Sequence, residues 1–141
     1  MPTLSEVLIG TGQLTWARHE RVSDRYGTVR LFSEDEALPL EGTYHAGKAG
    51  HLVVEVLETR QSEHVGDLFR GIFPTTPNVG DQMTLGEGKL FFDSDEDGDM
   101  VGVEPADGRD SDWLDPKMLY RAHQQTVRLI FVPSNGEKQC K

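Results

Sequence analysis

The sequence contains very little cysteine and no long apolar run. Its single cysteine, Cys140, lies one residue from the C-terminus, so no disulfide bond can form within the chain. A helix that spans a membrane needs about 20 consecutive apolar residues, and no stretch of this kind occurs. The first ten residues also lack the basic and apolar regions of a secretory signal peptide. These absences predict a cytoplasmic protein that does not enter a membrane.

The sequence also lacks the motifs that identify common classes of enzyme. It has no G-x-S-x-G segment of the kind found in serine hydrolases, and Gly10 and Gly12 lack the third glycine of a dinucleotide-binding fingerprint. The five histidines have no cysteine partners and no regular spacing, which argues against a structural zinc site. One enzyme hypothesis stays open, a histidine-dependent reaction with or without the assistance of a metal ion. Its candidate residues are His19, His45, His51 and His64.

Basic residues are scarce, and the acids gather in one region. The chain has 14 Lys and Arg against 24 Asp and Glu, which gives a net charge of −10. This balance argues against direct binding of nucleic acid, because neutralising phosphates requires a basic face. Residues 93–115 hold ten acids and one base, a net charge of −9, whereas the other 118 residues sum to −1. Such a localised acidic block indicates a local function.

Length and hydrophobic patterning predict a single β-rich domain over residues 1–133, followed by a flexible tail at 134–141. Alternation of apolar and polar residues indicates strands, the first two joined by a tight turn and the third rich in valine. A helix is predicted after Asp115, which suits an N-cap and is followed by proline. The predicted strands are 13–22, 26–32, 51–60, 67–73, 82–85, 88–92, 100–104 and 126–132.

These elements predict a mainly β fold. The economical architecture is a small antiparallel β-barrel or β-sandwich of about 7 to 8 short strands, with one short helix near residues 116–124. Glycines and prolines in the intervening segments mark surface loops. In particular, Gly86 and Gly88 are taken to separate two short paired strands.

The stretch FFDSDEDGDMVGVEP, residues 91–105, resembles the twelve-residue calcium loop of the EF-hand family. The resemblance covers residues 93–104 and implies a calcium site, because short aspartates at alternating positions converge on the ion and a distant glutamate closes the site. Neither flank favours a helix. We therefore expect a calcium loop between strands, with weak affinity. The implied ligands are Asp93, Asp95, Asp97, the backbone carbonyl of Asp99, and Glu104.

Two interpretations of the same segment need no metal. Asp-Gly between apolar runs favours a plain β-hairpin turn. Alternatively, the acidic block is a docking surface for a basic protein, to which Asp107, Asp110 and Asp112 also contribute. Arg18 and Arg21 belong to a separate basic cluster, which would bind a phosphate or an acidic partner, face the acidic block, or form only the solvated face of two strands.

The sequence therefore predicts a non-enzymatic binding or accessory protein. Its acidic segment, residues 93–115, would bind a divalent cation or a basic protein partner. A second hypothesis treats this segment as a nucleic-acid mimic that inhibits a nuclease or a DNA-binding protein through charge complementarity. The sequence indicates neither the oligomeric state nor the order of the strands.

Overall fold

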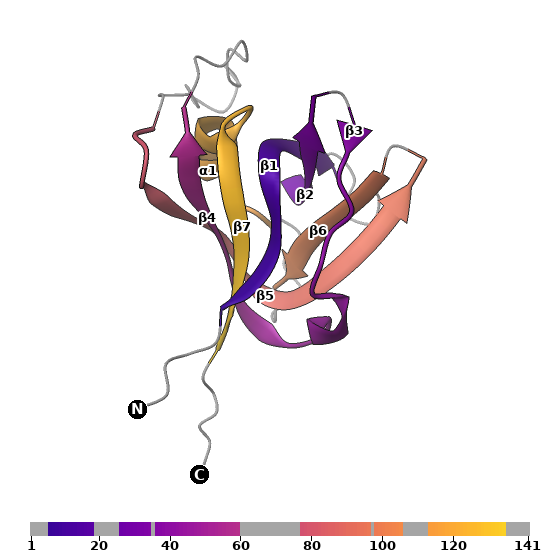
Figure 1. Ribbon diagram of the computed structural model, residues 1–141. Coiled ribbons are helices and arrows are strands. Elements are labelled where there is room, and N and C mark those ends of the chain that lie inside the picture. The colour runs from indigo at the N-terminus through magenta and orange to yellow at the C-terminus, as the bar shows by residue number, and fades with distance from the viewer. Residues whose placement is uncertain are drawn as a thin grey trace.

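The computed structural model describes residues 6–18, 26–34, 36–59, 77–96, 98–105 and 113–134. Over these residues the chain forms seven strands, one α-helix and one short 3-10 helix (Figure 1). The strands are β1 (Val7–Arg18), β2 (Tyr26–Ser33), β3 (Glu36–Ala37), β4 (Ala49–Glu58), β5 (Gln82–Asp95), β6 (Gly98–Glu104) and β7 (Thr126–Pro133). The helices are η2 (Thr43–His45) and α1 (Pro116–Ala122).

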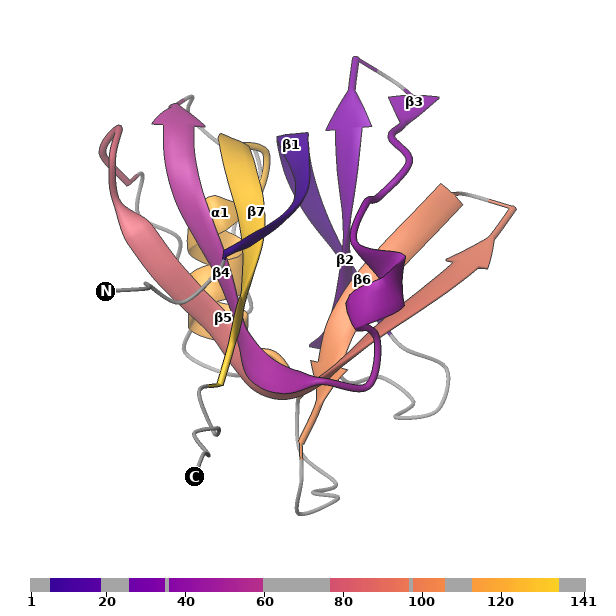
Figure 2. The same ribbon diagram turned by 60° about the horizontal axis from the view of Figure 1, so that its bottom comes forward.

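Six of these strands close into an antiparallel barrel. Their order is β1-β7-β4-β5-β6-β2, and β2 pairs back with β1. The short strand β3 adds to β2 through two residue pairs, so it lies beside the barrel rather than within it (Figure 2). The predicted mainly β fold is thus confirmed, and the architecture is a barrel.

The barrel closes through a narrow seam between β2 and β6. One registered pair, Val29↔Val101, joins these strands, whereas seven pairs join β5 to β6. Beside the seam, Gly102 is buried, and a Cβ atom added there would lie 2.1 Å from the carbonyl oxygen of Gly27. The two strands can approach this closely because residue 102 has no side chain.

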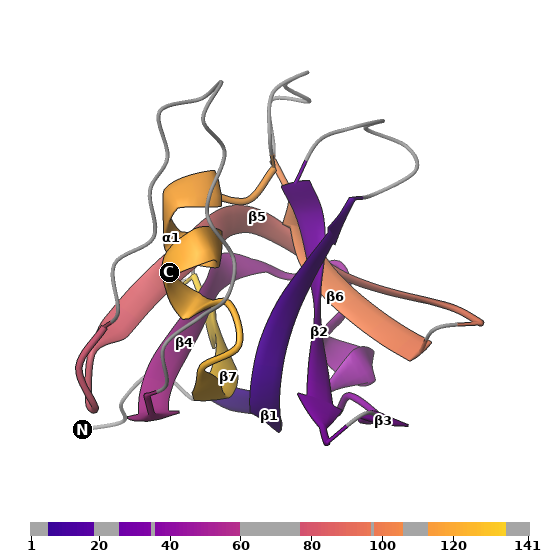
Figure 3. The ribbon, with the colours of Figure 1, turned by 90° about the horizontal axis from the view of Figure 1, so that it is seen from above.

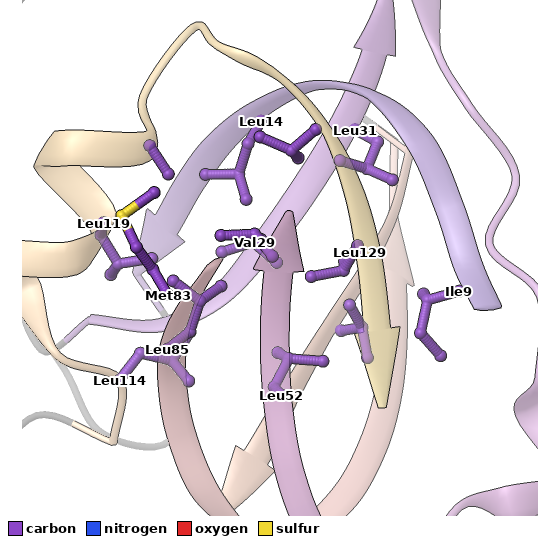
Figure 4. Packing of buried hydrophobic residues seen from close by; sticks show 14 of the residues in the cluster. Ile9, Leu14, Val29, Leu31, Leu52, Met83, Leu85, Leu114, Leu119 and Leu129 are labelled. Atoms are coloured by element: carbon purple, nitrogen blue, oxygen red, sulfur yellow. The ribbon is translucent and has the colours of Figure 1, made fainter. Parts of the chain in front are cut away.

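Apolar side chains from all six barrel strands fill the interior (Figure 4). Strand β4 illustrates the pattern, because Leu52, Val54 and Val56 are buried and alternate with half-buried residues. This two-residue period is the one that places every second side chain on the same face of a strand. The strongest sequence signal, valine-rich alternation at 51–60, therefore corresponds to an inward-facing stripe.

Helix α1 covers one end of the barrel. It contacts both β1 and β5, which lie three strands apart in either direction around the ring, so the helix must extend across the opening (Figure 3). Leu119 of the helix is fully buried in the core. The helix begins as predicted, because the side chain of Asp115 accepts a hydrogen bond from the backbone N–H of Lys117 at 2.9 Å.

The segment that joins β3 to β4 covers the opposite end. The N–H of Glu41 donates to the carbonyl of Ile9 in β1 at 2.8 Å, and the N–H of Gly47 donates to Leu90 in β5 at 2.7 Å. Both ends of the barrel are therefore covered, and the interior is occupied by side chains. A binding site is consequently expected on the outer surface of the barrel.

Part of the strand prediction was wrong. Residues 82–85 and 88–92 are not a short pair but parts of one continuous strand, β5. Its two glycines permit close approach rather than a turn: a Cβ at Gly86 would lie 3.0 Å from the carbonyl oxygen of Trp113, and one at Gly88 would lie 2.2 Å from that of Glu104. The predicted strand at 67–73 lies outside the described residues.

Within the described part of the chain, no helix is long and apolar enough to cross a membrane. Ser134, the first residue of the predicted tail, donates its N–H to the carbonyl of Ala49 at 2.8 Å. The rest of that tail lies outside the described residues.

Candidate functional site

The acidic segment forms the end of a long β-hairpin. Strands β5 and β6 pair from Lys89↔Glu104 to Asp95↔Gly98, so two residues of the sequence lie between the last paired positions. Short hairpin connections of this kind favour Asp-Gly sequences. The glycine of this Asp-Gly pair, Gly98, is the first residue of β6.

This hairpin separates some of the residues that the calcium resemblance groups together. Glu104 is six residues from Gly98 along β6, which corresponds to about 20 Å in an extended strand. Asp93 is paired with Met100 and Asp99 with Ser94. Because successive residues of a strand point to opposite faces, Asp93 and Asp99 belong to opposite faces of the hairpin.

Calcium binding by residues 93–104 stays a prediction. Asp97 and the side chain of Asp95 lie outside the described part of the structure. Among the residues that are described, no group of three or more His, Cys, Asp and Glu side chains is arranged to hold a metal ion. The placement of Glu104 favours interpretations in which the acids near the turn act without it.

A comparison of calcium with magnesium tests this point. If the acids act as a diffuse negative surface, about 1 mM of either ion should raise the melting temperature by the same small amount, because both screen charge equally. Differential scanning calorimetry on chelator-treated protein measures the two shifts. A rise of several degrees with calcium alone, removed by Asp93→Asn, would instead establish a calcium site.

Two carboxylates near the turn are held by backbone groups. The Asp93 Oδ1 atom accepts a hydrogen bond from the N–H of Ser94 at 2.8 Å. The Asp99 Oδ2 atom accepts one from the N–H of Leu40 at 3.2 Å. Asp99 therefore fastens the segment after β3 to the β5–β6 hairpin, although the two residues are 59 positions apart in the sequence.

The structure brings a second acidic hairpin to the same place. Strand β3 lies against the start of β6, since a Cβ added at Gly98 would be 2.4 Å from the Cβ of Ala37. Figures 1 and 2 show β3 and the tip of the β5–β6 hairpin on the same side of the molecule. We call six described acids, from near the turns of these two hairpins and from the segment after β3, the acidic end. They are Glu34, Glu36, Glu41, Asp93, Glu96 and Asp99, all exposed except the half-buried Asp99.

The two sequence segments that contribute the acidic end are strongly acidic. Residues 33–44 and 90–104 together contain ten acids and no lysine or arginine, a formal charge of −10. The remaining residues hold 14 acids and 14 bases. The stretch SEDEALPLEG, residues 33–42, was the signal that sequence reasoning missed, because its four acids are not contiguous with the larger block.

Asp115, the last acid of the predicted block, lies elsewhere. Asp115 caps α1, and its N–H donates to the carbonyl of Leu85 at 2.7 Å, which places it at the end of the barrel that the helix covers. Arg18 ends β1, where it pairs with Tyr26. The other predicted contact residues, Asp107, Asp110, Asp112 and Arg21, lie outside the described residues.

A shallow depression of about 210 Å³ opens on the acidic end. Its lining consists of Thr43, Phe92, Asp93, Ser94 and Asp99. Next to Thr43, the ring of Tyr44 is 83% exposed and lies 4.3 Å from the ring of His45 between centroids. The depression thus combines an aromatic surface with carboxylates.

The histidines of the enzyme hypothesis have separate surroundings where they are described. His45 Nδ1 lies 3.1 Å from the Nζ atom of Lys48, and His51 Nε2 lies 3.6 Å from Glu87 Oε2 on the neighbouring strand. His19 and His64 lie outside the described residues. A histidine-dependent activity therefore stays a prediction.

No protein-family model, curated protein or solved structure matches this chain. The acidic end is therefore the feature that suggests a function. Its main elements are the concentration of charge, the depression beside β5 and the pairing of the hairpin strands.

Proposed function

We propose that this protein is a non-enzymatic cytoplasmic binding protein that docks its acidic end on a basic surface of a partner protein. The observation that carries the proposal is the charge distribution: acids from two hairpins that are distant in sequence lie on the same side of the barrel, in segments (33–44 and 90–104) that contain no lysine or arginine. Because side chains fill the interior, the barrel acts as a rigid support for this surface.

Electrostatics give the acidic end a physical reason to bind a cationic partner. Two unit charges about 6 Å apart in water repel by roughly 0.7 kcal/mol, and residues 33–44 and 90–104 contain no lysine or arginine to offset this repulsion. A basic partner relieves the repulsion and is also steered toward the surface during diffusion. Binding should therefore weaken as salt concentration rises.

A charge-matched pair of variants tests the proposal. The first carries Glu34→Gln, Glu36→Gln and Glu96→Gln at the acidic end, and the control carries Glu6→Gln, Glu58→Gln and Glu87→Gln elsewhere on the surface. All six glutamates are exposed, and both variants lose the same charge. With polylysine as the basic probe, calorimetry at low salt should show binding at least about fivefold weaker for the first variant and nearly unchanged for the control.

Equal weakening in both variants would mean that overall charge, not the acidic end, determines binding, and would refute the proposal. A partner purified on the wild-type protein should also be lost with the first variant. If nucleic acid displaces that partner, its basic surface is a nucleic-acid-binding cleft, and the protein acts as a nucleic-acid mimic.

A further inference from the structure

Strand β5 changes its hydrogen-bonding neighbours halfway along its length. Its first half pairs with β4, up to Ala49↔Lys89, and its second half pairs with β6. On the β4 side, the last two hydrogen bonds involve Leu90. Its N–H donates to the carbonyl of Lys48 at 2.9 Å, and its carbonyl accepts from the N–H of Gly47 at 2.7 Å. Shortly before Gly47, the chain belongs to η2 rather than to a strand. Among the described residues, no strand therefore covers this edge of β5 beyond Leu90.

The backbone groups at this edge follow from the alternation of a β-strand. In an antiparallel pair, successive residues direct their N–H and C=O groups to opposite sides. Because the N–H and C=O of Leu90 point to the β4 side, those of Phe92 and Ser94 point the same way. The N–H of Ser94 is accordingly bonded to the side chain of Asp93 rather than to a strand.

The depression lies directly beside this edge. Phe92, which is half-buried and packs against the core, provides an apolar surface, and Thr43 of η2 forms the facing wall. Asp99 accepts one hydrogen bond, at 3.2 Å, whereas a carboxylate offers about four acceptor positions. A cationic side chain that enters the depression can therefore pair with Asp99.

We propose that the acidic end binds an extended basic peptide, which adds as a strand to the Phe92–Ser94 edge of β5. A lysine or arginine of the peptide lays its aliphatic stem on Phe92 and directs its cation to Asp99. A peptide carbonyl replaces Asp93 Oδ1 on the N–H of Ser94. This inference rests on the proposed function and specifies the form of the partner.

The negative charge of the acidic end favours a basic peptide over a second copy of this chain as the strand that pairs with the β5 edge. Open strand edges invite pairing between identical molecules. Here such pairing would bring two acidic ends together, each with several exposed carboxylates. A cationic strand meets the same edge with attraction in place of repulsion.

Two peptides of equal charge test strand addition. One is an octapeptide of alternating lysine and valine, and the other has the same sequence with alternate backbone nitrogens methylated, which removes its hydrogen-bond donors. We expect calorimetry to show at least about tenfold weaker binding of the methylated peptide, because main-chain hydrogen bonds provide affinity in strand addition. Equal affinities would overturn the inference.

Matched substitutions test the same edge on the protein. Ser94→Pro removes the outward N–H without removing a bond to β6, whereas Ser94→Ala retains it. The proline variant should bind the unmethylated octapeptide at least about tenfold more weakly, and the alanine variant should bind as the wild type does. If the proline variant is unfolded by circular dichroism, slowed amide exchange at Phe92 and Ser94 in the wild-type complex supplies the test, and unchanged exchange overturns the inference.

The outcomes separate this inference from the proposed function. If the two peptides bind with equal affinity, and the acidic-end glutamine variant binds both more weakly, the proposed function stays intact and strand addition is overturned. Polylysine binding that is indifferent to the same variant would overturn both. A doubled molecular mass of the free protein in solution, lost with Ser94→Pro, would assign the edge to a second copy and overturn the peptide as its occupant.

Discussion

Replacing Gly102 with alanine is expected to lower the free energy of unfolding by about 3 kcal/mol or more. The new Cβ would lie 2.1 Å from the carbonyl oxygen of Gly27 and 3.0 Å from a ring carbon of Phe91. Because the clash is with backbone, β2 must move away from β6, and one registered pair joins these strands. Thermal unfolding should show a melting temperature lower by roughly 10 °C.

Gly47→Ala provides the control for this substitution. Gly47 has φ of +92°, and nothing lies within 4 Å of an added Cβ, so the cost there is the backbone strain alone, about 1 kcal/mol. If Gly102→Ala were no more destabilising than Gly47→Ala, the close approach of β2 and β6 would not be what closes the barrel.

Replacing Leu119 with alanine should lower the free energy of unfolding by about 2 to 5 kcal/mol. Leu119 is fully buried and lies close to Met83, Leu85 and Leu114 where α1 covers the end of the barrel (Figure 4). Truncation leaves a cavity at that end, which strands fixed in a closed ring can fill only partly. Urea unfolding measures the loss as a lower midpoint with an unchanged slope.

Lys117→Ala on the same helix is the matched control. Lys117 is exposed, and alanine favours a helix, so the free energy of unfolding should change by less than about 0.5 kcal/mol. A similarly small change for Leu119→Ala would contradict the role of α1 as the cover of the barrel, and the core would then be closed by the strands alone.

Local patterns made the fold class predictable. Alternation is strong in β4, where Leu52, Val54 and Val56 are buried between half-buried residues, and a period of two residues is a property of each strand by itself. The helix start was predictable for the same reason, since Asp115 and Pro116 act within one turn. Signals that depend on neighbouring residues need no knowledge of the tertiary structure.

The glycines in β5 were misread because their role is not local. Gly86 and Gly88 make room for Trp113 and Glu104, which belong to later segments of the chain. A sequence shows that a glycine is present but not whether it serves a turn or a close approach. Strand β1 also begins at Val7, six residues before the predicted strand, and this early part contains two further glycines.

The candidate site was only partly predictable from the sequence. The acids of the β5–β6 hairpin stand next to one another in the chain and were identified from composition. Those of the β2–β3 hairpin join them through tertiary contacts, including the bond between Leu40 and Asp99 across 59 positions. Contiguity in sequence therefore found one half of the acidic end and also included Asp115, which lies at the other end of the barrel.

The acids beside the open edge of β5 serve two purposes in this account. Exposed strand edges promote aggregation, and charged side chains at an edge oppose pairing between identical molecules. The same charges attract a cationic strand. The edge can therefore pair with a basic peptide, whereas the acids oppose its pairing with another copy of the chain.

The measurement that tests the acidic end most directly is a ¹H–¹⁵N NMR titration of the wild-type protein with the unmethylated octapeptide of alternating lysine and valine. We predict that the largest amide shift changes occur at Phe92, Ser94 and Asp99 and in the neighbouring residues 43–48, and that they diminish at high salt. Shift changes confined to β1, β7 or α1, with the β5–β6 hairpin unaffected, would contradict the account.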